Sequence, residues 1–161
     1  MWVEDNSSAL STYGEINSWD TSLITDMSYL FMSWNGLYTD FNDDISNWDV
    51  SNVTNMQQMF YKAFSFNQPL NNWDVSNVVN MQQMFDAALY FNQDLSDWDV
   101  SSVTNMRLMF HYLYNFNQDL SSWNVSNVTN MSNMFSSAFT FNGDISSWDV
   151  SSVTGMRGMF K

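Results

Sequence analysis

The chain has 161 residues, of which 45% are hydrophobic and 17% aromatic, and it contains no Cys. This composition supports a packed core and excludes an intrinsically disordered chain, disulfides and thiolate metal sites. The 17 acidic residues outnumber the Lys and Arg residues by 13, which disfavours nucleic-acid binding because phosphates are also negative. The four basic residues, Lys62, Arg107, Arg157 and Lys161, are expected to form no patch that reverses this preference.

Residues 1–15 carry no repeat and are predicted to be an N-terminal cap or lead-in. They lack the basic start and apolar centre of a signal peptide, and no apolar run in the chain reaches membrane-spanning length. We therefore expect no membrane insertion by this chain. The last repeat stops part of the way through a coil, at Phe160 and Lys161. This favours a segment of a longer secreted chain over a cytoplasmic protein, since a natural repeat array ends in a polar cap.

From residue 16 onward the sequence repeats a phrase that begins with Trp and ends with Met-Phe. Five copies follow each other at a period of 25 residues, and a first copy stands 29 residues before the second. The Trp residues are Trp19, Trp48, Trp73, Trp98, Trp123 and Trp148. This spacing predicts one repeat solenoid over residues 16–161, with coils starting near residues 16, 45, 70, 95, 120 and 145. A four-residue insertion falls within residues 32–40.

Each coil is predicted to contain a short strand, a helix and a return loop. Trp48 and Val50 alternate with the polar Asp49, which is typical of a strand with one buried face. Apolar residues at helical spacing within residues 53–64 predict a helix of two to three turns. Strands pack more closely than helices. The predicted fold is therefore α/β: a right-handed curved solenoid of about six strand–helix coils, like a leucine-rich repeat, with its parallel sheet on the concave side.

Equivalent positions of the repeat are expected to stack into columns. The apolar columns, which begin at Trp48, Val50, Val53, Met56, Met59 and Phe60, are interpreted as core. A further column, interpreted as structural, has an Asn after a Phe in each return loop, where its side chain can bond the backbone of the adjacent coil. Its members are Asn42, Asn67, Asn92, Asn117 and Asn142.

The candidate binding residues form one outward-facing column on the predicted concave face. They are Asp20, Asp49, Asp74, Asp99, Asn124 and Asp149. Like charges at strand spacing repel each other by about 1 kcal/mol or more per pair, so three explanations compete. Neighbouring Ser and Asn side chains could solvate the column, Ca²⁺ could bind between Asp49, Asp74 and Asp99, or the face could bind a basic or polar partner.

Two further sets of residues are candidates for binding. Asn47, Asn72 and Asp97 flank the acidic column and give a small, polar face suited to carbohydrate or to a hydrated protein contact. Trp34 and Tyr38 lie in the insertion and are interpreted either as a loop site or as a lid over the first coils. Catalysis is not indicated, because His111 is the only His and no nucleophile–base set or phosphate loop is present.

The phrase SNWDVSNVTNMQQMF, followed by FNQ, resembles the 25-residue repeat of BspA-like surface proteins, which fills many mycoplasma surface lipoproteins. The similarity covers nearly the whole chain, from about Ile16 to Phe160. The resemblance implies a leucine-rich-repeat horseshoe without catalytic residues, and several members look like adhesins or surface antigens. One departure is that Val53 and its equivalents occupy the position where leucine-rich repeats carry an inward Asn.

Together these patterns predict a non-enzymatic recognition or adhesion module that is extracellular or at a cell surface. Its acidic concave face would bind a protein or a glycan, with no cofactor other than Ca²⁺ as an option. The alternative is a structural spacer within a larger surface protein, which could associate end to end through its uncapped C-terminal coil.

Overall fold

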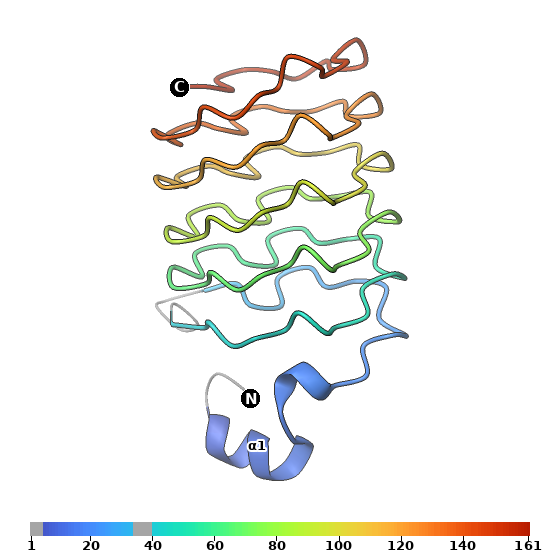
Figure 1. Cartoon of the computed structure of the whole chain (residues 1–161), viewed down its shortest axis with the longest axis vertical. Helices are drawn as coiled ribbons and strands as arrows, with labels where there is room; N and C mark the ends of the chain where they lie inside the picture. The colour runs from blue at the N-terminus through green and yellow to red at the C-terminus, as the bar shows by residue number, and fades with distance from the viewer. Residues whose placement is uncertain (1–4, 34–39) are drawn as a thin grey trace.

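The computed structural model of the chain describes residues 5–33 and 40–161 (Figure 1). Its N-terminal part holds the eight-residue helix α1 (Asn6–Tyr13) and the 3₁₀ helix η1 (Ile16–Ser18). Asp5 caps α1, since the Ser8 backbone N–H donates to its carboxylate at 3.0 Å. Among the described residues, no helix is long and apolar enough to cross a membrane. Trp34 and Tyr38 lie outside the described residues.

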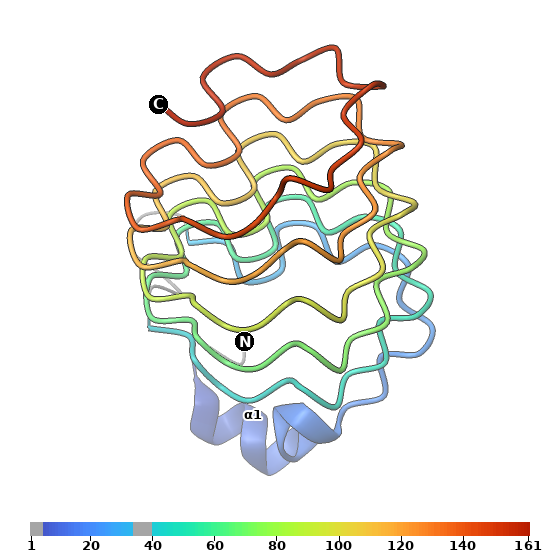
Figure 2. The same cartoon turned by 45° about the horizontal axis from the view of Figure 1, so that its top comes forward.

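The rest of the described chain forms coils that lie one above another. Figure 2 shows that successive coils follow nearly the same outline. Parallel bridges join each coil to the next through single residues: Asp26 to Asn55, Asn55 to Asn80, Asn80 to Asn105, Asn105 to Asn130, and Asn130 to Gly155. Because each bridge involves one residue per coil, the described residues contain no extended strand.

The segment predicted as a helix consists instead of successive tight turns. The Met59 N–H donates to the Met56 carbonyl at 3.2 Å, within one turn, whereas the Gln58 N–H donates to the Gln82 carbonyl of the next coil at 2.9 Å. This alternation continues along the segment and recurs in later coils. An α-helix would direct every such N–H to a carbonyl four residues earlier and would leave none to join the coils.

Left-handed backbone at one side of each coil makes these turns possible. Gln58 has φ of 54° and Lys62 has φ of 58°. The equivalent residues with positive φ are Tyr29, Gln83, Ala87, Leu108, Tyr112, Asn133, Ser137 and Gly158. Most of them are neither Gly nor Asn, so each such position costs about 1–2 kcal/mol, which the hydrogen bonds between coils must offset.

The predicted α/β, leucine-rich-repeat-like strand–helix solenoid is therefore wrong. Single-residue bridges replace its strands, and turns replace its helices at residues 53–64 and at the equivalent positions. The expected curvature depended on a difference in packing distance between a sheet and a row of helices. Neither layer is present in the described residues, so the predicted concave sheet face is not formed.

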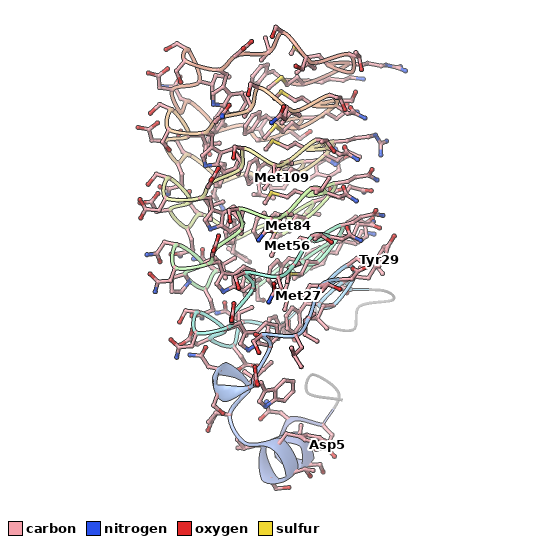
Figure 3. The ribbon with its side chains drawn as sticks, turned by 90° about the vertical axis from the view of Figure 1, so that its right-hand side faces the viewer. Asp5, Met27, Tyr29, Met56, Met84 and Met109 are labelled. Atoms are coloured by element: carbon pink, nitrogen blue, oxygen red, sulfur yellow. The ribbon has the colours of Figure 1, made fainter. Side chains whose placement is uncertain are left out.

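The predicted core columns are confirmed, except that their members in the last coil, Val150, Met156 and Phe160, are exposed. Val53, Met56, Met59 and Phe60 are fully buried, as are their equivalents in the three following coils except for Phe135, which is 2% exposed. The Phe60 ring stacks on Phe85 with centroids 5.5 Å apart and an interplanar angle of 3°. Figure 3 shows labelled Met side chains of successive coils inside the stack. Thus the coils bury their apolar side chains by stacking on one another.

The predicted structural role of the loop Asn column is also confirmed. The Asn92 side-chain oxygen accepts the backbone N–H of Asn117 at 3.0 Å, and the same contact joins the other members of the column. Gln118 adds a bond from its side-chain amide to the Asn92 carbonyl at 2.8 Å. The return loops are therefore joined by amide side chains that satisfy backbone groups outside any regular ladder.

Candidate functional site

The predicted acidic column lies on the outside of the stack, and one side-chain oxygen of each member accepts hydrogen bonds within its own turn. Its members, Asp20, Asp49, Asp74, Asp99, Asn124 and Asp149, are all exposed. In each case the side-chain oxygen accepts the backbone N–H of the Ser two residues later. For Asp49 this distance is 3.0 Å, and the Ser51 hydroxyl donates to the same oxygen at 2.6 Å. These are Asx turns, which stabilise a reversal of the chain.

The same hydrogen bonds offset the repulsion along the column. They lower the pKa of Asp20, Asp49, Asp99 and Asp149. For Asp49 the largest cause is the bond from the Ser51 hydroxyl, whereas the Asp20 carboxylate raises its pKa by the smallest effect. Solvation by neighbouring Ser residues is thus the explanation that the contacts support. The described residues contain no group of three or more His and acidic side chains that could hold a metal ion, and calcium between Asp49, Asp74 and Asp99 stays a prediction.

Replacing Asp99 with asparagine is expected to keep the fold and to remove part of the loss of stability in acid. Asn124 forms the same turn with an amide, accepting from Ser126 at 3.2 Å and 2.8 Å. Bonds from Ser101 lower the pKa of Asp99 in the folded state. The unfolded chain therefore binds more protons, and stability falls as the pH drops below about 4.

Urea unfolding of the wild type and of Asp99→Asn between pH 7 and pH 2.5 tests this expectation. The two proteins should have similar stability at pH 7, and the variant should lose less on acidification. Asp99→Ala is the matched control, because it removes the turn acceptor and is expected to cost about 1 kcal/mol at neutral pH. An Asp99→Asn variant that fails to fold would contradict the role assigned to the turn.

The other predicted residues are also exposed but are not gathered into one site. Asn47, Asn72 and Asp97 lie on the surface of three successive coils. Asn47 lines a hollow of about 450 Å³ with Glu15 and Asp43. The predicted residues therefore form a row with one member per coil, and within the described residues they do not converge on a shared concave face.

A second surface lies where the coils differ most in sequence. We call residues 61–65, 86–90, 111–115 and 136–140 the aromatic corner. Phe139 is 78% exposed and Tyr90 is 63% exposed. Tyr114 stacks on Phe139 with ring centroids 5.5 Å apart and an interplanar angle of 3°, and Tyr112 meets Tyr114 edge-on at 6.1 Å. The aromatic corner therefore exposes aromatic rings to solvent, whereas the interior of the stacked coils is buried.

The aromatic corner also contains a His–Asp pair. His111 Nδ1 lies 2.9 Å from a carboxylate oxygen of Asp86, whose side chain is only 6% exposed. The Gln83 side-chain amide donates to the other Asp86 oxygen at 2.9 Å. The signal in the sequence was the period itself, because residues 86 and 111 are 25 positions apart and so belong to one column. The pair orients the imidazole ring and leaves its Nε2 atom for another partner.

A pocket of about 470 Å³ adjoins these rings. Its described lining consists of Arg107, Leu108, His111, Tyr112, Asn133, Ser136, Ser137, Phe139 and Lys161. Two of the four Lys and Arg residues of the chain therefore face one pocket beside the only His. The expectation that the basic residues form no patch that reverses the repulsion of nucleic acids stays a prediction, although Arg107 and Lys161, which lie two coils apart, line one pocket.

This chain belongs to the family described as "Mycoplasma protein of unknown function, DUF285", whose model matches residues 3–112 and 90–161. The match extends over nearly all of the repeats and includes both the acidic column and the aromatic corner. No curated protein matches the chain.

Proposed function

We propose that this member of the mycoplasma repeat family is a non-enzymatic recognition or adhesion module, extracellular or at a cell surface, and that it binds glycans through the aromatic corner. The resemblance of the repeat to BspA-like surface proteins supports the location. The acidic column is a weaker candidate surface, because one oxygen of each carboxylate already accepts a hydrogen bond within its turn.

The observation that carries the proposal is the exposure of aromatic rings where the coil sequences diverge. Phe139 and Tyr90 are exposed, although most Phe and Trp side chains of the stack are buried. The parallel, stacked rings of Tyr114 and Phe139 form an aromatic platform, and the C–H face of a sugar ring can pack against its exposed ring, Phe139. Hydroxyl and amide groups of Ser137 and Asn133 line the adjoining pocket and can bond sugar hydroxyls.

The non-enzymatic assignment is supported by the arrangement of Asp86, His111 and Ser136, which occupy one column of the stack. These residue types match a Ser–His–Asp set in composition. The Ser136 hydroxyl, however, donates to the Lys161 backbone carbonyl at 3.4 Å, and no bond between Ser136 and His111 is found in the described residues. The hydroxyl is therefore not connected to a general base.

Binding of the purified chain to an array of cell-surface glycans tests the proposal. Phe139→Ala is expected to weaken binding about tenfold, or 1.4 kcal/mol, because it removes the outer ring of the platform. Leu23→Ala is the matched control, since Leu23 is 89% exposed in the first coil, outside the corner. Equal binding by the wild type and Phe139→Ala, or capture of proteins but of no glycan, would overturn the proposal.

A spacer or self-assembling segment is the second candidate, and it is favoured by the exposed face of the last coil. Val150, Met156 and Phe160 are 40%, 43% and 62% exposed, although their equivalents in the preceding coil are buried. A further coil stacked on this face would bury them. Light scattering across a concentration series tests association between copies: a rising average mass supports it, and a constant monomer mass contradicts it.

A further inference from the structure

We infer that the pocket beside the aromatic corner is a binding site for an acidic saccharide, that is, a sugar bearing a single carboxylate. This inference rests on the proposed function and names the chemical class of its ligand. Arg107 and Lys161 line the pocket, and no Asp or Glu side chain is among its described lining residues. In a chain with a net charge of −13, such a site is an unusual local concentration of positive groups.

The cations of the pocket are available to a ligand. Across residues 5–33 and 40–161, neither Arg107 nor Lys161 forms an ion pair with an acidic side chain. The nearest buried carboxylate, Asp86, is already bonded to His111 and Gln83. An Arg guanidinium presents paired N–H donors that match the two oxygens of a carboxylate. Arg107 is thus the residue best suited to select an anionic group.

The contact with Asp86 orients His111 so that its ring can also contact the ligand. Its Nδ1 atom lies 2.9 Å from the Asp86 carboxylate. An ionised carboxylate can only accept, so the tautomer with the proton on Nδ1 fits this contact and leaves Nε2 as the ring nitrogen available to a ligand. Asp86 acts as a positioning residue, because its side chain is buried and holds the ring rather than the ligand. A hydroxyl of the acidic sugar can donate a hydrogen bond to Nε2 of His111 while the carboxylate of the same sugar accepts hydrogen bonds from Arg107.

The size and the remaining lining of the pocket indicate a saccharide rather than a free inorganic anion. A volume of about 470 Å³ lies within the range of small-molecule sites and exceeds what an inorganic anion fills. The rings of Tyr112 and Phe139 line it together with the side chain of Asn133. Aromatic rings beside amide and hydroxyl groups suit a ligand that has both an apolar face and hydroxyls.

The charge of the whole chain restricts the ligand to few negative charges. A polyanion such as a nucleic acid or a heavily sulfated polysaccharide extends beyond the pocket and is repelled by the net charge of −13 on the chain. A disaccharide with one carboxylate places its only charge next to Arg107 and Lys161. The pocket is therefore expected to prefer a monoanionic sugar both to a neutral sugar and to a polyanion.

Calorimetric titration of the chain of residues 1–161 with matched sugars tests the inference. Cellobiuronic acid and cellobiose differ by one carboxylate, as do 3′-sialyllactose and lactose in their terminal acidic sugar. We expect at least one acidic sugar to bind tenfold or more tightly than its neutral partner, and acetate alone to bind more weakly than either acidic sugar. Arg107→Gln should remove at least tenfold of the affinity for the acidic sugar.

Arg157→Gln is the matched control, because it makes the same change in net charge at an equivalent position of the repeat, and Arg157 is not among the described lining residues. It should change affinity less than twofold, with both variants verified as folded by circular dichroism. Equal losses in the two Arg variants would reduce the effect to general electrostatics and overturn the inference. Equal binding of neutral and acidic sugars, abolished by Phe139→Ala, would overturn the acidic pocket but leave the proposed function standing, whereas no binding of any glycan would overturn both.

Discussion

Replacing Phe85 with alanine is expected to lower the free energy of unfolding by about 3–5 kcal/mol. The Phe85 ring is fully buried and packs between Phe60 and Phe110 of the neighbouring coils, with centroid distances of 5.5 Å and 6.0 Å. It also stacks on Phe91 of its own coil at 4.1 Å. Removal of the ring leaves a cavity that touches three coils, and each coil depends on its neighbours for burial.

Urea unfolding, followed by tryptophan fluorescence and by circular dichroism, measures this loss. Phe160→Ala is the matched control, because Phe160 occupies the same position of the repeat but is 62% exposed. It is expected to cost less than about 1 kcal/mol. Similar losses for the two variants would contradict an interior column in which burial by neighbouring coils supplies the stability.

The core columns could be predicted from the sequence because they depend only on the period. Residues 25 positions apart take the same place in successive coils, so an apolar residue that recurs at that spacing meets its own equivalents. The Phe60 and Phe85 rings follow this rule, and so do the loop residues Asn67 and Asn92. Neither result depends on the local backbone conformation, which explains why both predictions are confirmed despite the wrong fold class.

The conformation between Val53 and Phe64 could not be predicted from the apolar spacing. A row of tight turns directs a side chain inward every three or four residues, as a helix does. The apolar spacing is therefore the same for both conformations. What distinguishes the two is the left-handed backbone, and Gln58 and Lys62 adopt it although neither residue type favours it. The sequence did contain one signal, since Asn133 and Gly158 occupy the same position as Gln58.

The contact between Asp86 and His111 was missed because equivalence between coils was used only for repeated residues. Asp86 and His111 share a column but differ in type, so their contact at 2.9 Å follows from the period without forming a motif. The same reasoning would have placed Lys161 two coils beyond His111. In a stacked repeat protein, positions that break the pattern are as close to each other as those that keep it, and binding residues can be sought among them.

Replacing Trp98 with phenylalanine is expected to lower the free energy of unfolding by about 1–3 kcal/mol. Trp98 is 3% exposed, and its indole N–H donates to the Leu70 carbonyl, which belongs to the preceding coil start, at 2.9 Å. The same bond recurs from Trp48, Trp73, Trp123 and Trp148 to Ile16, Ile45, Leu95 and Leu120. Phenylalanine keeps an aromatic ring but loses the donor, which leaves the buried carbonyl with one bond fewer.

Trp19→Phe is the matched control, because it makes the same change where the indole hydrogen bond is exposed instead of buried. Trp19 is only partly buried, and its indole N–H donates to the Tyr13 backbone carbonyl at 3.2 Å. Its replacement should therefore lower the free energy of unfolding less than the replacement of Trp98. Hydrogen exchange followed by nuclear magnetic resonance gives an independent readout. In the wild type the indole N–H of Trp98 should exchange slowly, since its donor is buried and bonded. If Trp98→Phe is as stable as the wild type, or if that N–H exchanges as fast as an exposed one, the indole column does not hold the coils together, and ring packing alone does so.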